Sequence, residues 1–146
     1  MISVSPDYGS AISQTFTLVY AAPNGFSDLT EVRALFGTST DAVDACYVWY
    51  DPMRDALRLG DDDAANWKEV SLRGSGSAEN SQCRISAAGS SVSGAGTRLT
   101  VRLRVTFKRA FAGRKNVYLY AEERQGLKTG LVRMGRWVVP YEEAGT

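Results

Sequence analysis

The chain of 146 residues contains no histidine and only two cysteines. Without histidine, a Ser-His-Asp triad, a Cys-His pair and every zinc site that needs an imidazole ligand are excluded. The two cysteines, Cys46 and Cys83, do not form a CxxC pair, so the usual thiol redox motif is also missing. These absences remove the commonest routes to hydrolytic and redox catalysis, and we expect a protein that is not an enzyme.

One catalytic class needs neither residue type, because a pair of carboxylates can hydrolyse a glycosidic bond. Acidic side chains for such a pair exist at Asp44, Asp51 and Asp55 and in the run 61–63. A glycosidase also needs a deep, shaped cleft, which a small β-sandwich rarely provides. The non-enzymatic interpretation is therefore preferred.

The sequence also lacks an excess of one charge and a long apolar run. Its formal net charge is +1, which gives no long-range attraction for nucleic acid. No window approaches the roughly 18 apolar residues of a membrane-spanning helix, and the N-terminus lacks the basic and apolar regions of a signal peptide. We expect no nucleic-acid partner and no membrane insertion. If Met1 is a start codon added to an excised module, the missing signal does not argue against export.

The clearest positive pattern is the strict alternation over 98–107. Apolar side chains at Leu99, Val101, Leu103, Val105 and Phe107 alternate with polar ones. A period of two predicts a half-buried antiparallel strand. The apolar face of such a strand needs a second sheet packed about 10 Å away.

Shorter segments of similar character recur along the chain, and turn residues separate them. We expect strands within 2–6, 12–20, 32–36, 45–50, 56–59, 67–72, 117–121 and 131–139, with one helical turn at 28–31. The segment 74–96, rich in Gly, Ser and Ala, is expected to hold two short edge strands. No segment has the 3.6-residue period of a longer helix. The sequence predicts a single all-β domain over 1–146, folded as an antiparallel sandwich.

Several turn and strand signatures resemble those of bacterial immunoglobulin-like and fibronectin type III-like modules. The segment 112–121, Gly126-Leu127 and the segment 135–139 look like their last hairpin, and Ser5-Pro6 and the segment 28–36 are similar to their first strands. The resemblance implies an immunoglobulin-like Greek-key sandwich that serves secreted or surface proteins as a spacer, an adhesive unit or a sugar-binding accessory module.

The chain departs from the antibody pattern around its cysteines. Trp49 follows Cys46 by three residues, and Cys83 precedes the long strand, so the inter-sheet Cys-Trp-Cys core is absent. The stretch between Cys46 and Arg98 is long enough to add extra middle strands. A disulfide between Cys46 and Cys83 is expected, and it would suit a secreted domain. The alternative is two separate buried thiols in a cytosolic protein.

The run Asp61, Asp62 and Asp63 is a candidate calcium loop, because a hard cation takes carboxylate and carbonyl oxygens that a loop can present together. The spacing is not that of an EF-hand, and the alternative is an acidic turn that keeps the loop soluble. No cofactor is required for folding, and any calcium would have a structural role.

Aromatic placement is the most informative functional signal. If Cys46, Val48 and Tyr50 face the core, Tyr47 and Trp49 project together from the opposite face, about 7 Å apart along the strand. The same alternation turns Tyr118 and Tyr120 outward, and Trp67 follows the acidic loop. Such a row could hold a polysaccharide without a cleft, because aromatic side chains combine an apolar body with a polar tip. The alternatives are an inverted register with Tyr47 and Trp49 in the core, or a face covered by the middle segment.

These observations favour a non-catalytic accessory module of a secreted or cell-surface bacterial protein. The expected ligand is a polysaccharide, bound by the aromatic row Tyr47, Trp49, Trp67, Tyr118 and Tyr120. The competing interpretation is a structural spacer or adhesion domain that contacts only other domains of its parent protein. In either case we expect a monomer. The arginines at 102 and 104 are interpreted as the solvated side of their strand.

Overall fold

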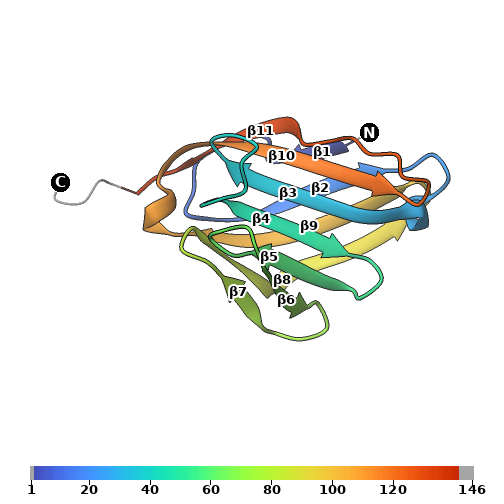
Figure 1. Ribbon diagram of the computed structural model, residues 1–146, viewed down its shortest axis with the longest axis horizontal. Coiled ribbons are helices and arrows are strands. Elements are labelled where there is room, and N and C mark those ends of the chain that lie inside the picture. The colour runs from blue at the N-terminus through green and yellow to red at the C-terminus, as the bar shows by residue number, and fades with distance from the viewer. Residues whose placement is uncertain (1, 142–146) are drawn as a thin grey trace.

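A computed structural model describes residues 2–141, which form two antiparallel sheets packed face to face as a sandwich (Figure 1). Sheet A has the strand order β1-β2-β9-β8-β7, and sheet B has the order β11-β10-β3-β4-β5-β6. The strands are β1 (Ile2–Ser5), β2 (Ser13–Ala21), β3 (Leu29–Gly37), β4 (Cys46–Asp51), β5 (Ala56–Gly60), β6 (Trp67–Ser71), β7 (Ser77–Glu79), β8 (Cys83–Ala95), β9 (Arg98–Phe107), β10 (Gly113–Glu123) and β11 (Val132–Val139).

The strand order is consistent with an immunoglobulin-like sandwich. Strands β1, β2, β9 and β8 follow the A-B-E-D order of such folds, and β11, β10, β3, β4 and β5 follow the G-F-C-C′-C″ order of the variable type. Strands β6 and β7 add one edge to each sheet, and both lie in the long stretch between Cys46 and Arg98. The prediction of an all-β sandwich with extra middle strands is confirmed.

Strand β9 has the bounds expected from its alternation and lies between β2 and β8 in sheet A. Its apolar side chains are buried against the inner face of sheet B, and its arginines at 102 and 104 point away from the core. A group of aromatic rings fills one part of the core: Phe16 lies 4.9 Å from Phe36 and 4.9 Å from Trp137 between ring centroids. The core is therefore formed by the apolar side chains that alternate with polar ones along the strands of both sheets.

One local expectation was right only in part and another was wrong. The segment 74–96 contains one short edge strand, β7, as expected, but β8 spans thirteen residues and pairs with both β9 and β7, so it is not a second one. Its Ser, Gly and Ala residues have low strand propensity, but the long neighbour β9 supplies backbone partners, with an irregularity between Ser86 and Ser91. The helical turn is a 3₁₀ turn at Phe26–Asp28, earlier than expected, because Leu29 already belongs to β3 and is buried.

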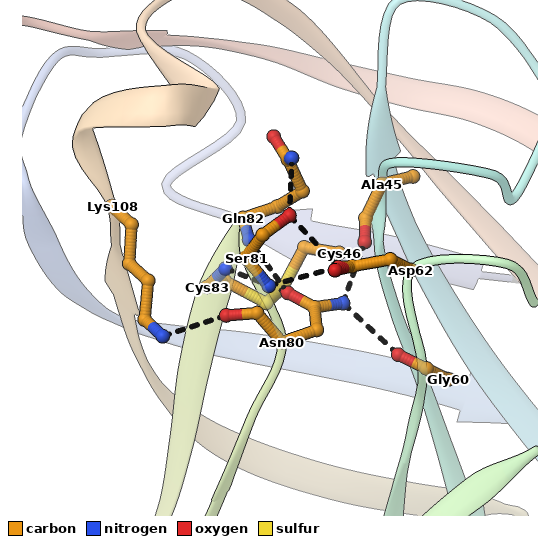
Figure 2. The surroundings of a disulfide bond; sticks show 9 residues. All are labelled: Ala45, Cys46, Gly60, Asp62, Asn80, Ser81, Gln82, Cys83 and Lys108. Carbon is orange, nitrogen blue, oxygen red and sulfur yellow. Dashed lines mark hydrogen bonds between the residues drawn. A yellow bond between two sulfur atoms is a disulfide. The ribbon is translucent and has the colours of Figure 1, made fainter.

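The predicted disulfide is present and joins the two sheets (Figure 2). Cys46 opens β4 in sheet B and Cys83 opens β8 in sheet A, and both are fully buried. No helix among residues 2–141 is long and apolar enough to cross a membrane.

Candidate functional site

Strand β4 alternates as the sequence predicts. Cys46, Val48 and Tyr50 are buried between the sheets, whereas Tyr47 and Trp49 are half-buried on the outer side of sheet B. The inverted register, which would have placed Tyr47 and Trp49 in the core, is excluded. These two residues are neither core residues nor freely exposed ones.

The register of sheet B aligns a row of side chains across five strands. Directly paired positions run from β10 to β6 in the order Tyr120, Arg33, Trp49, Arg58 and Glu69. In the neighbouring row, Tyr118 is paired with Leu35, and Leu35 with Tyr47. Because paired residues of antiparallel strands point to the same side, all of these side chains share the outer face.

Trp67 completes the arrangement from the edge strand β6. Its ring centroid lies 5.3 Å from that of Tyr47 and 5.4 Å from that of Trp49. Its pairing partner on β5 is Gly60, which has no side chain to occupy the space between Trp67 and Tyr47. We call the five predicted residues Tyr47, Trp49, Trp67, Tyr118 and Tyr120 the aromatic face.

Two arginines lie among these rings. The guanidinium of Arg33 lies 5.2 to 5.7 Å from the ring centroids of Trp49, Tyr120, Tyr47 and Trp67, and that of Arg58 lies 4.5 Å from the Trp49 ring. Cation–π contacts of this kind hold the rings in place. Arg33 also donates a hydrogen bond of 2.6 Å to the Tyr47 hydroxyl. Burial opposes the charge of Arg33, but hydrogen bonds with Tyr47 and Glu31 raise its pKa overall.

Carboxylates border the aromatic face and are paired. Glu31 binds Arg33, Asp51 lies 3.3 Å from Arg58, and Glu69 lies 3.2 Å from Arg58. Tyr120 donates a hydrogen bond of 2.7 Å to Glu122. Burial, together with that hydrogen bond, raises the pKa of Tyr120 to about 12. The hydroxyl therefore keeps its proton at neutral pH, donates it to Glu122 and can still accept a hydrogen bond.

The outer face of sheet B has a small apolar base of its own. Leu35 is fully buried although its backbone places it on the outer side, in register with Tyr118 and Tyr47. Ala56 on β5 is buried on the same side. The aromatic face therefore stands on a packed layer, which restricts the movement of its rings.

Sequence reasoning identified the five aromatic residues but missed the arginines. Arg33 could have been found, because it lies between the core residues Val32 and Ala34 and must point to the same side as Trp49. Its contact with four rings, however, depends on the pairing of β3 with β10 and β4. Nothing in the local sequence specifies that pairing.

The acidic loop 61–63 directly follows Gly60 at the end of β5 and lies next to the disulfide. Asp61 accepts a hydrogen bond of 3.0 Å from the Ala65 amide, and that bond lowers the pKa of its carboxyl group. Asp62 accepts hydrogen bonds from the backbone amide and the hydroxyl of Ser81, at 2.8 and 2.9 Å (Figure 2). Among the described residues, no group of three or more acidic, cysteine or histidine side chains is placed to hold a metal ion.

Thermal unfolding can test whether Asp61, Asp62 and Asp63 bind calcium or form an acidic turn without a metal. Because two of these carboxylates already accept hydrogen bonds that fix the loop, we expect the midpoint to be the same in 5 mM CaCl₂ and in EDTA, within about 1 °C. A saturable rise in midpoint with calcium, abolished in Asp62→Asn and Asp63→Asn, would show that the loop is a metal site.

Comparison of the chain with known protein families, with curated proteins and with solved structures finds no match. The fold and the arrangement of the outer face of sheet B therefore carry the functional inference.

Proposed function

We propose that the protein is a non-catalytic accessory module of a secreted bacterial protein and binds polysaccharide through the aromatic face. The observation that carries the proposal is the alignment of half-exposed aromatic rings, guanidinium groups and carboxylates on one side of sheet B. The cross-strand row from Tyr120 to Glu69 extends over five strands, about 19 Å at the usual strand spacing.

This combination of groups matches the surface of a glycan chain. A sugar ring has an apolar C–H face, which packs on an aromatic ring, and peripheral hydroxyls, which need hydrogen-bond partners. Trp67 and Tyr120 lie toward the two ends of the aromatic face, with fixed polar groups of Arg33, Arg58 and Glu69 beside and between them. Since paired polar groups on a packed base are already oriented, little side-chain entropy is lost when a ligand binds.

The disulfide supports the extracellular part of the proposal. Disulfides form and persist in oxidising compartments and are rare in the bacterial cytosol. The Cys46–Cys83 bond is buried and links the two sheets, which suits a protein that folds in a compartment where the bond can form.

The competing function is that of a spacer or adhesion domain, and one observation favours it. Arg58 stacks on Trp49, and Arg33 occupies the space between four rings, so part of the aromatic surface is already covered by the protein itself. A face of this kind, rich in Tyr, Trp and Arg, also suits contact with a neighbouring protein domain. Glycan binding and domain contact are separable by experiment.

Affinity electrophoresis and calorimetry against soluble glycan chains test the proposed function. We expect Trp67→Ala and Tyr120→Ala each to weaken binding by about tenfold, because each removes one stacking ring. Tyr8→Ala is the matched control, since Tyr8 is 77% exposed in the loop after β1 and is not part of the aromatic face, and its binding should equal that of the unchanged protein.

The same preparations are unfolded with urea so that loss of binding is not mistaken for loss of folding. Binding that survives both substitutions, or the absence of binding to every neutral and acidic glycan tested, would contradict the proposal and favour the spacer. Loss of binding with folded protein in both variants would support it.

A further inference from the structure

A second feature lies beside the aromatic face, where β10 and β11 pair at the edge of sheet B (Figure 1). A cleft of about 410 Å³ is open to solvent there. Its lining is basic and contains no carboxylate; the lining residues are Thr38, Arg114, Lys115, Asn116, Arg133, Arg136, Trp137 and Val138.

The strand pairing brings three arginines to one side of the sheet. Arg114 is paired with Val138, Asn116 with Arg136, and Tyr118 with Arg133. Because Arg114, Asn116 and Tyr118 alternate along β10, they and their partners all point outward. Arg114, Arg133 and Arg136, which we call the arginine cleft, therefore share the face that carries the aromatic residues.

A β-bulge makes this arrangement possible. Arg133 and Arg136 are three residues apart, so in a regular strand their side chains would point to opposite sides. The register of β11 against β10 shifts between Val117 and Tyr118, where Met134 is left without a partner. The extra residue turns Arg133 to the same side as Arg136.

Gly135 keeps the bulge next to the loop that follows β1. A Cβ atom at Gly135 would lie 2.6 Å from the carbonyl oxygen of Asp7, too close for any other residue. That same carbonyl accepts a hydrogen bond of 2.8 Å from the Arg136 amide. The position of Arg136 is therefore fixed by backbone contacts, although its side chain is exposed.

The charge of the arginine cleft is not neutralised by the part of the chain that the structure describes. None of Arg114, Arg133 and Arg136 forms an ion pair with residues 2–141, whereas Glu31, Asp51, Glu69 and Glu122 on the same face are all paired with cations. Lys115 also lines the cleft but alternates to the other side of β10, where its ammonium lies 4.2 Å from the centroid of the Phe111 ring. The outer face of sheet B is thus locally positive at the cleft, although the chain as a whole has a net charge of only +1.

The cleft and the aromatic face form one surface. Asn116 lines the cleft, and its side-chain amide donates a hydrogen bond of 3.1 Å to the hydroxyl of Tyr118, which belongs to the aromatic face. Tyr118 is paired on one side with Arg133 and on the other with Leu35. Arg133 therefore continues the row that contains Tyr47 and Tyr118, and Arg136 and Arg114 follow it on the next rows along β10.

We infer that the polysaccharide is acidic and that the arginine cleft binds its carboxylate or sulfate groups, an inference that rests on the proposed glycan-binding function. Guanidinium groups bind such anions through paired hydrogen bonds with a fixed geometry. The aromatic face supplies stacking for sugar rings, and the cleft supplies counter-charges beside it, along the paired strands β10 and β11. Duplex nucleic acid fits less well, because its backbone needs a basic surface along many phosphates, and the carboxylates around Arg33 and Arg58 interrupt this one.

The test uses the full chain and four soluble polymers: polygalacturonate for carboxylates, dextran sulfate for sulfates, and neutral xylan and β-glucan. We expect at least one acidic polymer to bind ten times more tightly than either neutral one at moderate salt. The triple variant Arg114→Gln, Arg133→Gln, Arg136→Gln should lose at least tenfold in affinity for that polymer. It should leave any neutral-glycan binding within about twofold.

A triple variant on the opposite sheet gives the matched control. Arg84→Gln, Arg98→Gln and Arg102→Gln remove three exposed arginines of sheet A, with the same change in net charge. This variant should bind the acidic polymer within about twofold of the unchanged protein. Equal losses in the two triple variants, or equally tight binding of a DNA duplex, would show non-specific attraction and overturn the inference.

Different results contradict the proposed function and the acidic ligand. If neutral and acidic glycans bind equally and only Trp67→Ala and Tyr120→Ala weaken them, the proposed function stands and the acidic ligand is wrong. If no glycan binds at all, both are wrong. Preference for dextran sulfate over polygalacturonate, or the reverse, identifies which anion the cleft binds.

Discussion

Replacing Cys46 and Cys83 together by alanine should lower the free energy of unfolding by about 4 kcal/mol. The bond closes a loop with a sequence separation of 37 residues, and its loss releases that loop entropy to the unfolded chain. It is also the covalent link between the first residue of β4 in sheet B and the first residue of β8 in sheet A. Because β8 is rich in small residues that bury little apolar surface, few other contacts can replace it.

Urea unfolding followed by tryptophan fluorescence measures this change. The unchanged protein in reducing buffer should unfold at nearly the same urea concentration as the double variant, since both lack the bond. Thiol titration of the unreduced, denatured protein should find no free thiol. A double variant that is destabilised by less than about 1 kcal/mol would mean that the two sheets hold together without the disulfide.

The disulfide and the aromatic face show what the sequence could predict. Strict alternation specifies which side chains share a face, so Tyr47 and Trp49 were placed correctly opposite Cys46 and Val48. A chain with only two cysteines allows one intramolecular pairing, so the Cys46–Cys83 disulfide could be predicted from the sequence.

The features that were missed depend on contacts between strands far apart in the sequence. Arg33 contacts Tyr120 because β3 pairs with β10. These two strands are far apart in the sequence, and no local pattern encodes their pairing. The arginine cleft depends on a bulge in β11, and the period-two reading assigns Arg133 and Arg136 to opposite sides. The length of strand β8 was underestimated because its small residues have low strand propensity. Its length is decided by its pairing with β9.

On the outer face of sheet B, substitutions at the centre of the ring cluster affect stability as well as binding, whereas substitutions at its margins affect mainly binding. Trp49 and Arg33 lie at the centre of the ring cluster above the buried Leu35, so their substitution disturbs packing as well as any ligand contact. Trp67 and Tyr120 lie toward the ends of the aromatic face, and the arginines of the cleft are exposed. Variants at these outer positions are therefore the cleaner probes of binding.

Asn80 should be the most sensitive polar position in the fold, because its side chain makes four hydrogen bonds beside the disulfide (Figure 2). Its amide nitrogen donates to the carbonyl oxygens of Ala45 and Gly60 at 3.0 and 2.9 Å, which lie at the start of β4 and the end of β5. Its side-chain oxygen accepts from the amides of Gln82 and Cys83 at 2.8 and 2.9 Å. One buried side chain thus links two neighbouring strands of sheet B, at the same end of the sheet, to the turn that begins β8 in sheet A.

Asn80→Ala leaves these two carbonyl oxygens and two amides without their partner, and we expect the free energy of unfolding to fall by about 3 kcal/mol or more. Asn24→Ala, at an exposed asparagine in the turn after β2, is the control and should change stability by less than about 0.5 kcal/mol.

Asn80→Asp separates hydrogen bonding from shape. The introduced carboxyl group has nearly the same size as the amide but, when ionised, faces two carbonyl oxygens as an acceptor. Burial beside those oxygens raises the pKa of that group in the folded state above its unfolded value. The variant should therefore be least stable at neutral pH and should regain stability as the pH falls toward 4, where the protonated group donates one hydrogen bond. Equal stability of Asn80→Asp at pH 7 and pH 4.5, measured relative to the unchanged protein, would show that the four hydrogen bonds do not hold the two sheets in register.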